Sequence, residues 1–282
     1  MTTQLNKAVV VGVDGSPDSG LALDWAAAEA RLRGAPLYAV YGLWMPMAAV
    51  PFGGAAVLPP SEELRAYATE VLDAARQRAK ETAPDLDVDT FLVLRPPAQA
   101  LLDVAKDAGL VVAGTRGLGT LGSLVLGSVS GRVAAHATVP AVVVPPHEVS
   151  GDGSIVVGVD GSAHGDAALR FALTEAALRS ARVVAVGAFR MRGHTTAPER
   201  QEAEALVAAA LDRARAATGV TAEVTTVVEP GFPADVIVEA AADASLVVVG
   251  SRGRGDVRSM LLGSTSRAVL HQAARPVAVV RG

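Results

Sequence analysis

The sequence predicts an α/β protein made of two tandem doubly wound domains, each a five-stranded parallel sheet flanked by helices. The 282-residue chain repeats itself, because VVVGVDGS at 9–16 returns as VVGVDGS at 156–162. Short apolar runs alternate with helix-length segments in each half, which is typical of βαβ units whose sheet is covered on both faces. The length also suits about two domains.

In the first half, the β-branched run at 8–13 ends at Asp14-Gly15-Ser16, which predicts a strand followed by a turn. The next segment, Pro17–Arg33, has apolar residues at helical spacing and stops before Gly34, so we expect a helix there. The remaining expected elements are strands at 36–41, 88–94, 110–114 and 139–144, and helices at 61–82, at 97–108 and from Ser128.

The second half repeats this order, with helices between its strands. Its expected strands lie near 155–159, 182–188, 222–228, 246–250 and 276–280. A polar, glycine-containing segment at 146–154 is expected to be a linker. We therefore place domain 1 at 1–147 and domain 2 at 148–282.

The halves differ by about ten extra residues near 46–60, in an apolar segment rich in proline and glycine. We expect a flexible surface loop there. A lid or a partner-docking arm is the alternative.

Composition excludes several classes of function. The formal net charge of −4 gives no electrostatic footprint for nucleic acid, and the absence of cysteine excludes disulfides and thiolate metal sites. No secretory leader opens the chain, and no apolar run is long enough to span a membrane. We expect a cytoplasmic protein with neither nucleic acid nor membrane as a partner.

The most informative motif is a loop of the form Gly-x2-Gly-x9-Gly-Ser, which occurs once in each half at a constant offset. Its glycines are Gly114, Gly117 and Gly127, and then Gly250, Gly253 and Gly263. Glycine allows backbone to approach a ligand closely, and Gly-Ser at a helix start offers free N–H groups to an anion. Two copies with identical spacing favour two phosphate-binding sites over two simple turns.

Other phosphate motifs do not explain the chain. No Gly-Lys dipeptide occurs, which excludes a standard P-loop. GLGTLG at 117–122 matches Gly-x-Gly-x-x-Gly but follows the fourth expected strand instead of the first, so we interpret it as chance overlap with the longer motif.

Charged residues near the motifs leave alternatives open. Asp14 and Asp160 end the first strand of each half and either contact a nucleoside or a phosphate-bound metal ion, or cap the following helix. Arg116 and Arg252 share a repeat position and either meet phosphate or are solvated, whereas Arg254 is expected to be surface charge.

No catalytic constellation or metal site emerges from the sequence. None of the five histidines pairs at metal-ligand spacing, so solvated or structural histidines are expected. Neither a Gly-x-Ser-x-Gly elbow nor a nucleophile–base pair recurs in both halves. We predict no catalytic residue and no metal ligand set in the protein itself.

Together, VVVGVDGS, the glycine loop and the terminal VPAVVV run resemble a universal stress protein domain, and the whole chain resembles the tandem form of that family. The loop resembles the ATP-binding branch. The resemblance implies the strand order 3-2-1-4-5 and one ATP in each domain, accompanied by Mg²⁺. It also implies an intrachain pseudo-dimer that pairs the last strands, 139–144 with Val277–Val280.

The resemblance also implies the nucleotide-binding residues. Those of the first domain are Gly12, Val13, Asp14, Val40, Gly114, Arg116, Gly117, Gly127, Ser128, Val129 and Ser130. Those of the second domain are Gly158, Val159, Asp160, Val186, Gly250, Arg252, Gly253, Gly263, Ser264, Thr265 and Ser266. Asp14 and Val40 would flank adenine and ribose, and the Gly-Ser segment would hold the phosphates.

Three functions remain open on the sequence. The first is an ATP-binding regulatory protein of the stress response, which acts through nucleotide-dependent conformation or an unidentified protein partner, with a homodimer as a further assembly. The second is a slow ATPase or a phosphoryl or nucleotidyl transferase, and the third is a non-catalytic adapter with degenerate sites.

Overall fold

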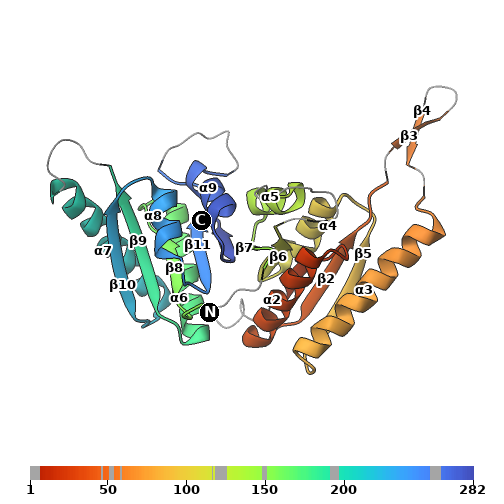
Figure 1. Cartoon of the computed structure of the whole chain (residues 1–282), viewed down its shortest axis with the longest axis horizontal. Coiled ribbons are helices and arrows are strands. Elements are labelled where there is room, and N and C mark those ends of the chain that lie inside the picture. The colour runs from red at the N-terminus through yellow and green to blue at the C-terminus, as the bar shows by residue number, and fades with distance from the viewer. Residues whose placement is uncertain are drawn as a thin grey trace.

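The structure is a computed structural model in which two α/β halves lie side by side and share one sheet (Figure 1). It describes residues 7–45, 47–50, 54–57, 59–115, 117, 126–147, 151–190, 197–254 and 262–282. At 47–50 and 54–57 only the backbone is described.

The first half alternates strands and helices as predicted. Its elements are β1 (Val9–Gly12), α2 (Pro17–Arg33), β2 (Leu37–Gly42), β3 (Met47–Val50), β4 (Gly54–Val57), α3 (Glu62–Thr82), β5 (Val88–Val93), α4 (Pro97–Val104), the 3-10 turn η1 (Ala105–Asp107), β6 (Leu110–Gly114), α5 (Ser128–His136) and β7 (Ala141–Val144). The last strand starts after Pro140, two residues later than expected, because proline has no N–H to give to a strand ladder.

The second half repeats the pattern without the β3–β4 pair. Its elements are β8 (Ile155–Gly158), α6 (Ala163–Arg179), β9 (Val183–Phe189), α7 (Ala197–Thr218), β10 (Val224–Pro230), α8 (Pro233–Ala240), β11 (Leu246–Gly250), α9 (Ser264–Gln272) and β12 (Val277–Val280). Strand β10 begins and ends two residues later than expected.

The ten strands of the main sheet follow the order β10-β9-β8-β11-β12-β7-β6-β1-β2-β5. Each half thus has the predicted order 3-2-1-4-5, and the strands within a half are parallel. The halves join through β12 and β7, which are antiparallel, with Val277 opposite Val143 and Val279 opposite Ala141. The predicted intrachain pairing of the last strands is therefore confirmed.

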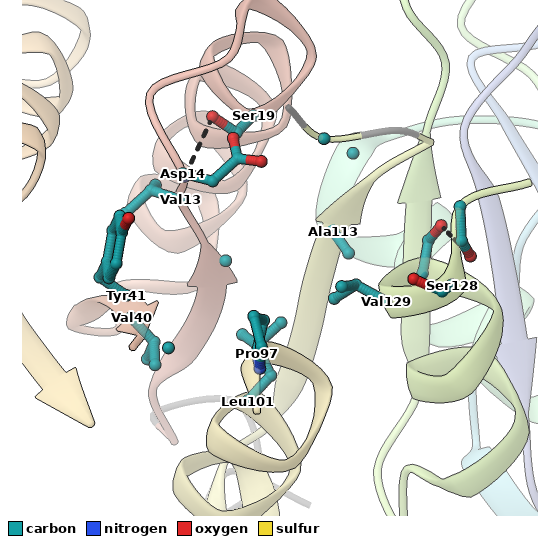
Figure 2. A pocket seen from close by; sticks show the side chains of 16 residues that line it. Val13, Asp14, Ser19, Val40, Tyr41, Pro97, Leu101, Ala113, Ser128 and Val129 are labelled. Carbon is teal, nitrogen blue, oxygen red and sulfur yellow. Dashed lines mark hydrogen bonds between the residues drawn. The ribbon is translucent and has the colours of Figure 1, made fainter. Parts of the chain in front are cut away.

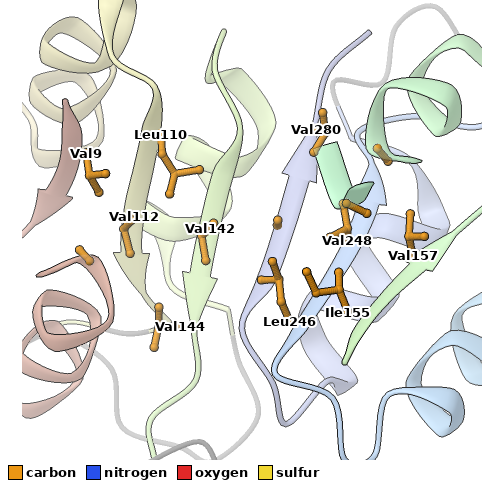
Figure 3. Close-up of a cluster of buried hydrophobic side chains, with 14 of the residues drawn as sticks. Val9, Leu110, Val112, Val142, Val144, Ile155, Val157, Leu246, Val248 and Val280 are labelled. Atoms are coloured by element: carbon orange, nitrogen blue, oxygen red, sulfur yellow. The ribbon is translucent and has the colours of Figure 1, made fainter. Parts of the chain in front are cut away.

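Valine-rich strands are buried on both faces, as the continuous apolar runs predict. One core cluster spans the two halves, and Figure 3 shows Val142 of β7 in the same cluster as Val248 of β11. Two further clusters lie apart from this one. The cluster around Leu101 lies in the first half, and the cluster around Ile237 lies mainly in the second half but includes Ala134 and Val143 of the first. Burial of a valine or leucine side chain stabilises by about 1.5–3 kcal/mol, so the shared cluster resists separation of the halves.

A buried group of four charges also crosses the boundary between the halves. Glu29 and Arg33 lie on α2, and Glu175 and Arg179 occupy the same positions on α6. Each arginine pairs with both glutamates, including Arg33 with Glu29 at 2.6 Å and Arg179 with Glu175 at 3.1 Å. Since both carboxylates are 1% exposed, this charge quartet depends on its internal pairing.

The expectation of a loop near 46–60 was wrong. Strands β3 and β4 form an antiparallel hairpin in which Met47 lies opposite Val57 and Val50 lies opposite Gly54. The pair is separate from the main sheet and projects from the first half beyond α3 (Figure 1). The physical reason is that two short segments of small apolar residues lie close together along the chain and can pair as an antiparallel ladder.

Candidate functional site

A crevice opens where β1 and β6 end side by side in the first half. The two strands are hydrogen-bonded neighbours, so Asp14, which follows β1, meets the glycine loop that follows β6. The winding of the sheet changes direction between these strands, which is where doubly wound folds bind ligands. The crevice has a volume of about 360 Å³, within the usual range for small-molecule sites.

The second half has an equivalent crevice of about 310 Å³ beside β8 and β11. It contains Asp160 and the second glycine loop, as the repeat predicts. The two crevices therefore obey the same internal symmetry as the fold.

The described sequence candidates all line these crevices. In the first they are Gly12, Val13, Asp14, Val40, Gly114, Gly117, Gly127, Ser128, Val129 and Ser130. In the second they are Gly158, Val159, Asp160, Val186, Gly250, Arg252, Gly253, Gly263, Ser264, Thr265 and Ser266. Arg116 lies outside the described residues.

Each aspartate orients a helix cap instead of capping the helix itself. Asp14 Oδ1 accepts hydrogen bonds from Ser16 N at 3.0 Å and from Ser16 Oγ at 2.6 Å. Ser16 is the N-cap of α2, and its Oγ accepts from Ser19 N at 3.2 Å. Asp160 and Ser162 repeat the arrangement at the start of α6. The second carboxylate oxygen is directed toward the loop, since Arg254 N donates to Asp160 Oδ2 at 3.1 Å.

The glycines of the motif are needed for close approach. A Cβ atom on Gly114 would lie 2.7 Å from the carbonyl oxygen of Asp18, and one on Gly250 would lie 2.7 Å from the carbonyl carbon of His164. On Gly117 or Gly253 it would clash with Oδ2 of the aspartate. The loops therefore pack on the first turns of α2 and α6 at distances that only glycine allows.

The helix after each glycine loop starts without a side-chain cap. Gly127 and Gly263 are the N-caps of α5 and α9, and neither can supply a capping oxygen. The first N–H groups of an α-helix have no intrahelical partner, and the helix dipole is positive at this end. The arrangement leaves backbone donors at both crevices for an anion.

The last serine of each motif, Ser130 or Ser266, is hydrogen-bonded to a carbonyl oxygen near the end of the preceding strand. Ser130 Oγ donates to the carbonyl oxygen of Thr115 at 3.0 Å, and Ser266 Oγ donates to that of Gly250 at 2.6 Å. Both serines are buried, so their hydroxyls tie the helix to the preceding strand. A hydroxyl has one proton, and in this structure the hydroxyl protons of Ser130 and Ser266 are directed to these carbonyl oxygens.

Figure 2 shows the first crevice between two sets of elements: Val40 and Tyr41 lie on the side of β2, and Ser128 and Val129 lie on the side of α5. Val40 is almost fully buried, and its carbonyl oxygen accepts from Val13 N at 3.0 Å. The apolar end and the helix N-terminus are thus at different sides of one cavity.

Comparison with known proteins identifies the chain. The sequence profile described as the Universal stress protein family matches it twice, over residues 6–145 and 153–281. The chain belongs to the universal stress protein family.

Relatives within this family are similar along almost the whole chain. A universal stress protein of Mycolicibacterium smegmatis is 35% identical over 284 residues, with 97% of this chain and 96% of the relative covered. One of Mycobacterium tuberculosis is 34% identical over 294 residues, with the same coverage. The crystal structure of a universal stress protein from Archaeoglobus fulgidus is similar in fold, with a TM-score of 0.68 at 20% identity, covering 98% of this chain and 96% of that one.

Sequence reasoning missed several residues that line the crevices of this universal stress protein. Those of the first are Ser19, Tyr41, Gly42, Pro97, Leu101 and Ala113. Those of the second are Gly165, Ala188, Pro233, Ile237, Val249 and Arg254. Pro97 and Pro233 were detectable from the sequence, because each begins the helix that follows the third strand of its half. The start of that helix lies at the same end of the sheet as the end of the first strand.

Arg254 is exposed to solvent, as expected for surface charge, but it also lines the second crevice, where its backbone N–H donates to Asp160 Oδ2. Spacing in the sequence does not reveal this contact, because it depends on β8 and β11 being neighbours in the sheet.

Two titratable groups near the crevices have shifted pKa values. Burial raises the pKa of the Tyr41 phenol, and Tyr67 and Asp14 raise it further. Burial lowers the pKa of His164, and so do the neighbouring guanidinium groups of Arg252 and Arg281, while Asp160 opposes them. Consistent with a neutral ring, His164 Nδ1 accepts a hydrogen bond from Gly282 N at 2.9 Å.

Within the described ranges of this family member, no group of three or more His, Asp or Glu side chains could hold a metal ion. Among the same residues, none of the helices is both long enough and apolar enough to cross a membrane.

Proposed function

We propose that this universal stress protein is a regulatory protein that binds one ATP in each half and responds through conformation or partner binding. The observation that carries the proposal is the duplicated crevice, in which an uncapped helix N-terminus faces the carboxyl ends of two parallel strands. Such helix starts are suited to phosphate groups.

The chemistry of the lining fits the parts of ATP. Backbone N–H groups of Ser128, Val129 and Ser130, and of their counterparts in α9, would hold phosphate oxygens. The side that carries Val40, Pro97 and Leu101 is apolar and suits a purine ring. ATP combines a flat apolar base with a highly charged tail, so one cavity with both characters matches it.

Asp14 and Asp160 provide one carboxylate beside each glycine loop. Magnesium in nucleotide sites is commonly held by one or two carboxylates together with phosphate oxygens and water. A Mg²⁺ ion carried by ATP would find this carboxylate and would neutralise part of the phosphate charge.

Occupancy would act by ordering the loop backbone. Gly127 N donates to the carbonyl oxygen of Thr115 at 2.8 Å, and Gly263 N donates to that of Ser251 at 2.8 Å, so each helix start is tied to the strand end. In each half, a phosphate bound at the helix start would fix the glycine loop between the strand end and the helix. The surface that the loop offers to a partner would then change.

Isothermal titration calorimetry on nucleotide-stripped protein tests the proposal. We expect two moles of ATP per chain with micromolar or tighter dissociation constants. Absence of binding heat, together with absence of co-purifying nucleotide by mass spectrometry, would overturn it. Release of phosphate or AMP from bound ATP, measured in the same samples, would instead favour the enzymatic alternative.

A further inference from the structure

The two crevices carry different charges at equivalent positions. The second residue of α2 is Asp18, and the second residue of α6 is His164. Both backbones lie against the first glycine of the loop, because a Cβ atom on Gly114 or Gly250 would be 2.7 Å from them. An acid beside the first crevice is therefore replaced by an imidazole beside the second.

A second difference lies next to the glycine that follows each aspartate. A Cβ atom on Gly15 would lie 3.2 Å from the phenol oxygen of Tyr67, whereas one on Gly161 would lie 3.0 Å from Nη2 of Arg254. The same space is thus filled by an uncharged hydroxyl in the first half and by a guanidinium group in the second. In the repeat alignment, the position of Arg254 corresponds to Leu118.

Some buried side-chain atoms of the described residues have no hydrogen-bond partner. They are Nε of Arg252, Nε of Arg281 and Oε2 of Glu199 in the second half, and Oδ2 of Asp18 in the first half. Arg252 lines the second crevice and lowers the pKa of both His164 and Arg281. Arg252 thus brings positive charge to the second crevice, but Arg116 has the same repeat position in the first half, so Arg254 is the cation that distinguishes the two halves.

We propose that the second crevice selects nucleotides by the number of their phosphates, through Arg254, whereas the first crevice, which has Leu118 at that repeat position, depends much less on phosphate number. This inference rests on the proposed nucleotide binding. Charge-assisted hydrogen bonds from guanidinium groups strengthen with the charge on the phosphate oxygens, and a phenol or an adjacent carboxylate gives no such gain.

The experiment uses the full chain with one crevice blocked at a time. Gly127→Glu leaves the second crevice, and Gly263→Glu leaves the first, and each variant is titrated by calorimetry with AMP, ADP and ATP. We expect the ratio of the AMP to the ATP dissociation constant to be at least about tenfold larger for the second crevice, the effect of one charge-assisted hydrogen bond. Equal ratios in the two variants would overturn the inference while leaving the proposed function intact.

Substitution of the guanidinium separates its role from a general charge effect. In the Gly127→Glu background, Arg254→Leu should reduce the ATP preference by about tenfold and leave AMP binding nearly unchanged. Arg215→Leu removes an exposed cation on α7 as the matched control and should change neither affinity. Equal losses for AMP and ATP in Arg254→Leu would show a merely structural role, and no binding of any nucleotide by the unsubstituted chain would defeat the proposed function itself.

Discussion

Arg33 and Glu175 form an ion pair across the boundary between the two halves, although 142 residues separate them along the chain. The pair belongs to the charge quartet with Glu29 and Arg179, and it joins α2 to α6 underneath the β7–β12 connection. Because each arginine contacts both glutamates, each buried carboxylate is neutralised partly by its own half and partly by the other half.

Removal of one member of the quartet should destabilise the fold strongly. Arg33→Met keeps most of the side-chain length but leaves a buried carboxylate without its main partner, so we expect a loss of about 3–5 kcal/mol in the free energy of unfolding. Denaturant titration measures it. Arg213→Met breaks an exposed ion pair with Asp166 and should lose less than about 1 kcal/mol. Equal losses in the two variants would show that the quartet contributes no special stability.

The quartet also predicts a pH dependence of stability. Burial, followed by the nearby Glu29 carboxylate, raises the pKa of Glu175 from 4.5 to about 7. Between these values the folded protein binds more protons than the unfolded chain, so stability should fall as pH rises from about 4.5 through about 7.

The measurement compares unfolding free energies of the wild type and Glu175→Gln at pH 5, 6, 7 and 8. We expect the wild type to lose roughly 1–3 kcal/mol relative to the variant across this range. Glu62→Gln, in the exposed first turn of α3, should keep the wild-type profile. A constant difference between wild type and Glu175→Gln would contradict the assignment.

A glutamate at either helix N-cap should remove one nucleotide site. Gly127 and Gly263 have extended backbone angles that any residue can adopt, and a carboxylate suits a helix N-terminus, so both variants should fold. Each should lower the calorimetric stoichiometry for ATP from two to one. Gly127→Gln and Gly263→Gln have the same bulk without the charge and should retain weakened binding; identical loss with glutamine would mean that bulk alone excludes the ligand.

The close contact at Gly250 should be intolerant of even a methyl group. In Gly250→Ala the new Cβ would meet backbone atoms of His164 and Gly165, at 2.7 to 2.9 Å, and overpacking of this kind destabilises by about 1–3 kcal/mol. Gly131→Ala within α5 is the control, because its nearest neighbour is the flexible Leu126 side chain at 3.3 Å. Thermal unfolding should show a lower melting temperature for the first variant only, and unchanged melting for both would refute the packing argument.

The sequence was sufficient for the parts of the molecule that repeat. Identical glycine spacing in the two halves predicted both crevices, apolar runs predicted the strands, and the family resemblance implied their order. Side chains brought in by tertiary structure were not predictable: Tyr41 reaches the crevice from β2, and Arg254 from a returning loop. The quartet was equally hidden, because Glu29 and Arg33 look like an ordinary surface pair one helical turn apart.

The antiparallel joint between β7 and β12 forms within a single polypeptide, which contains both halves. In a symmetric assembly of two identical subunits, any substitution appears at both copies of a site at once. Covalent fusion removes that constraint. A substitution such as leucine to arginine can therefore arise in one crevice while the equivalent residue of the other crevice is unchanged. Covalent fusion therefore allows two crevices of the same architecture to diverge independently while they remain in a one-to-one ratio.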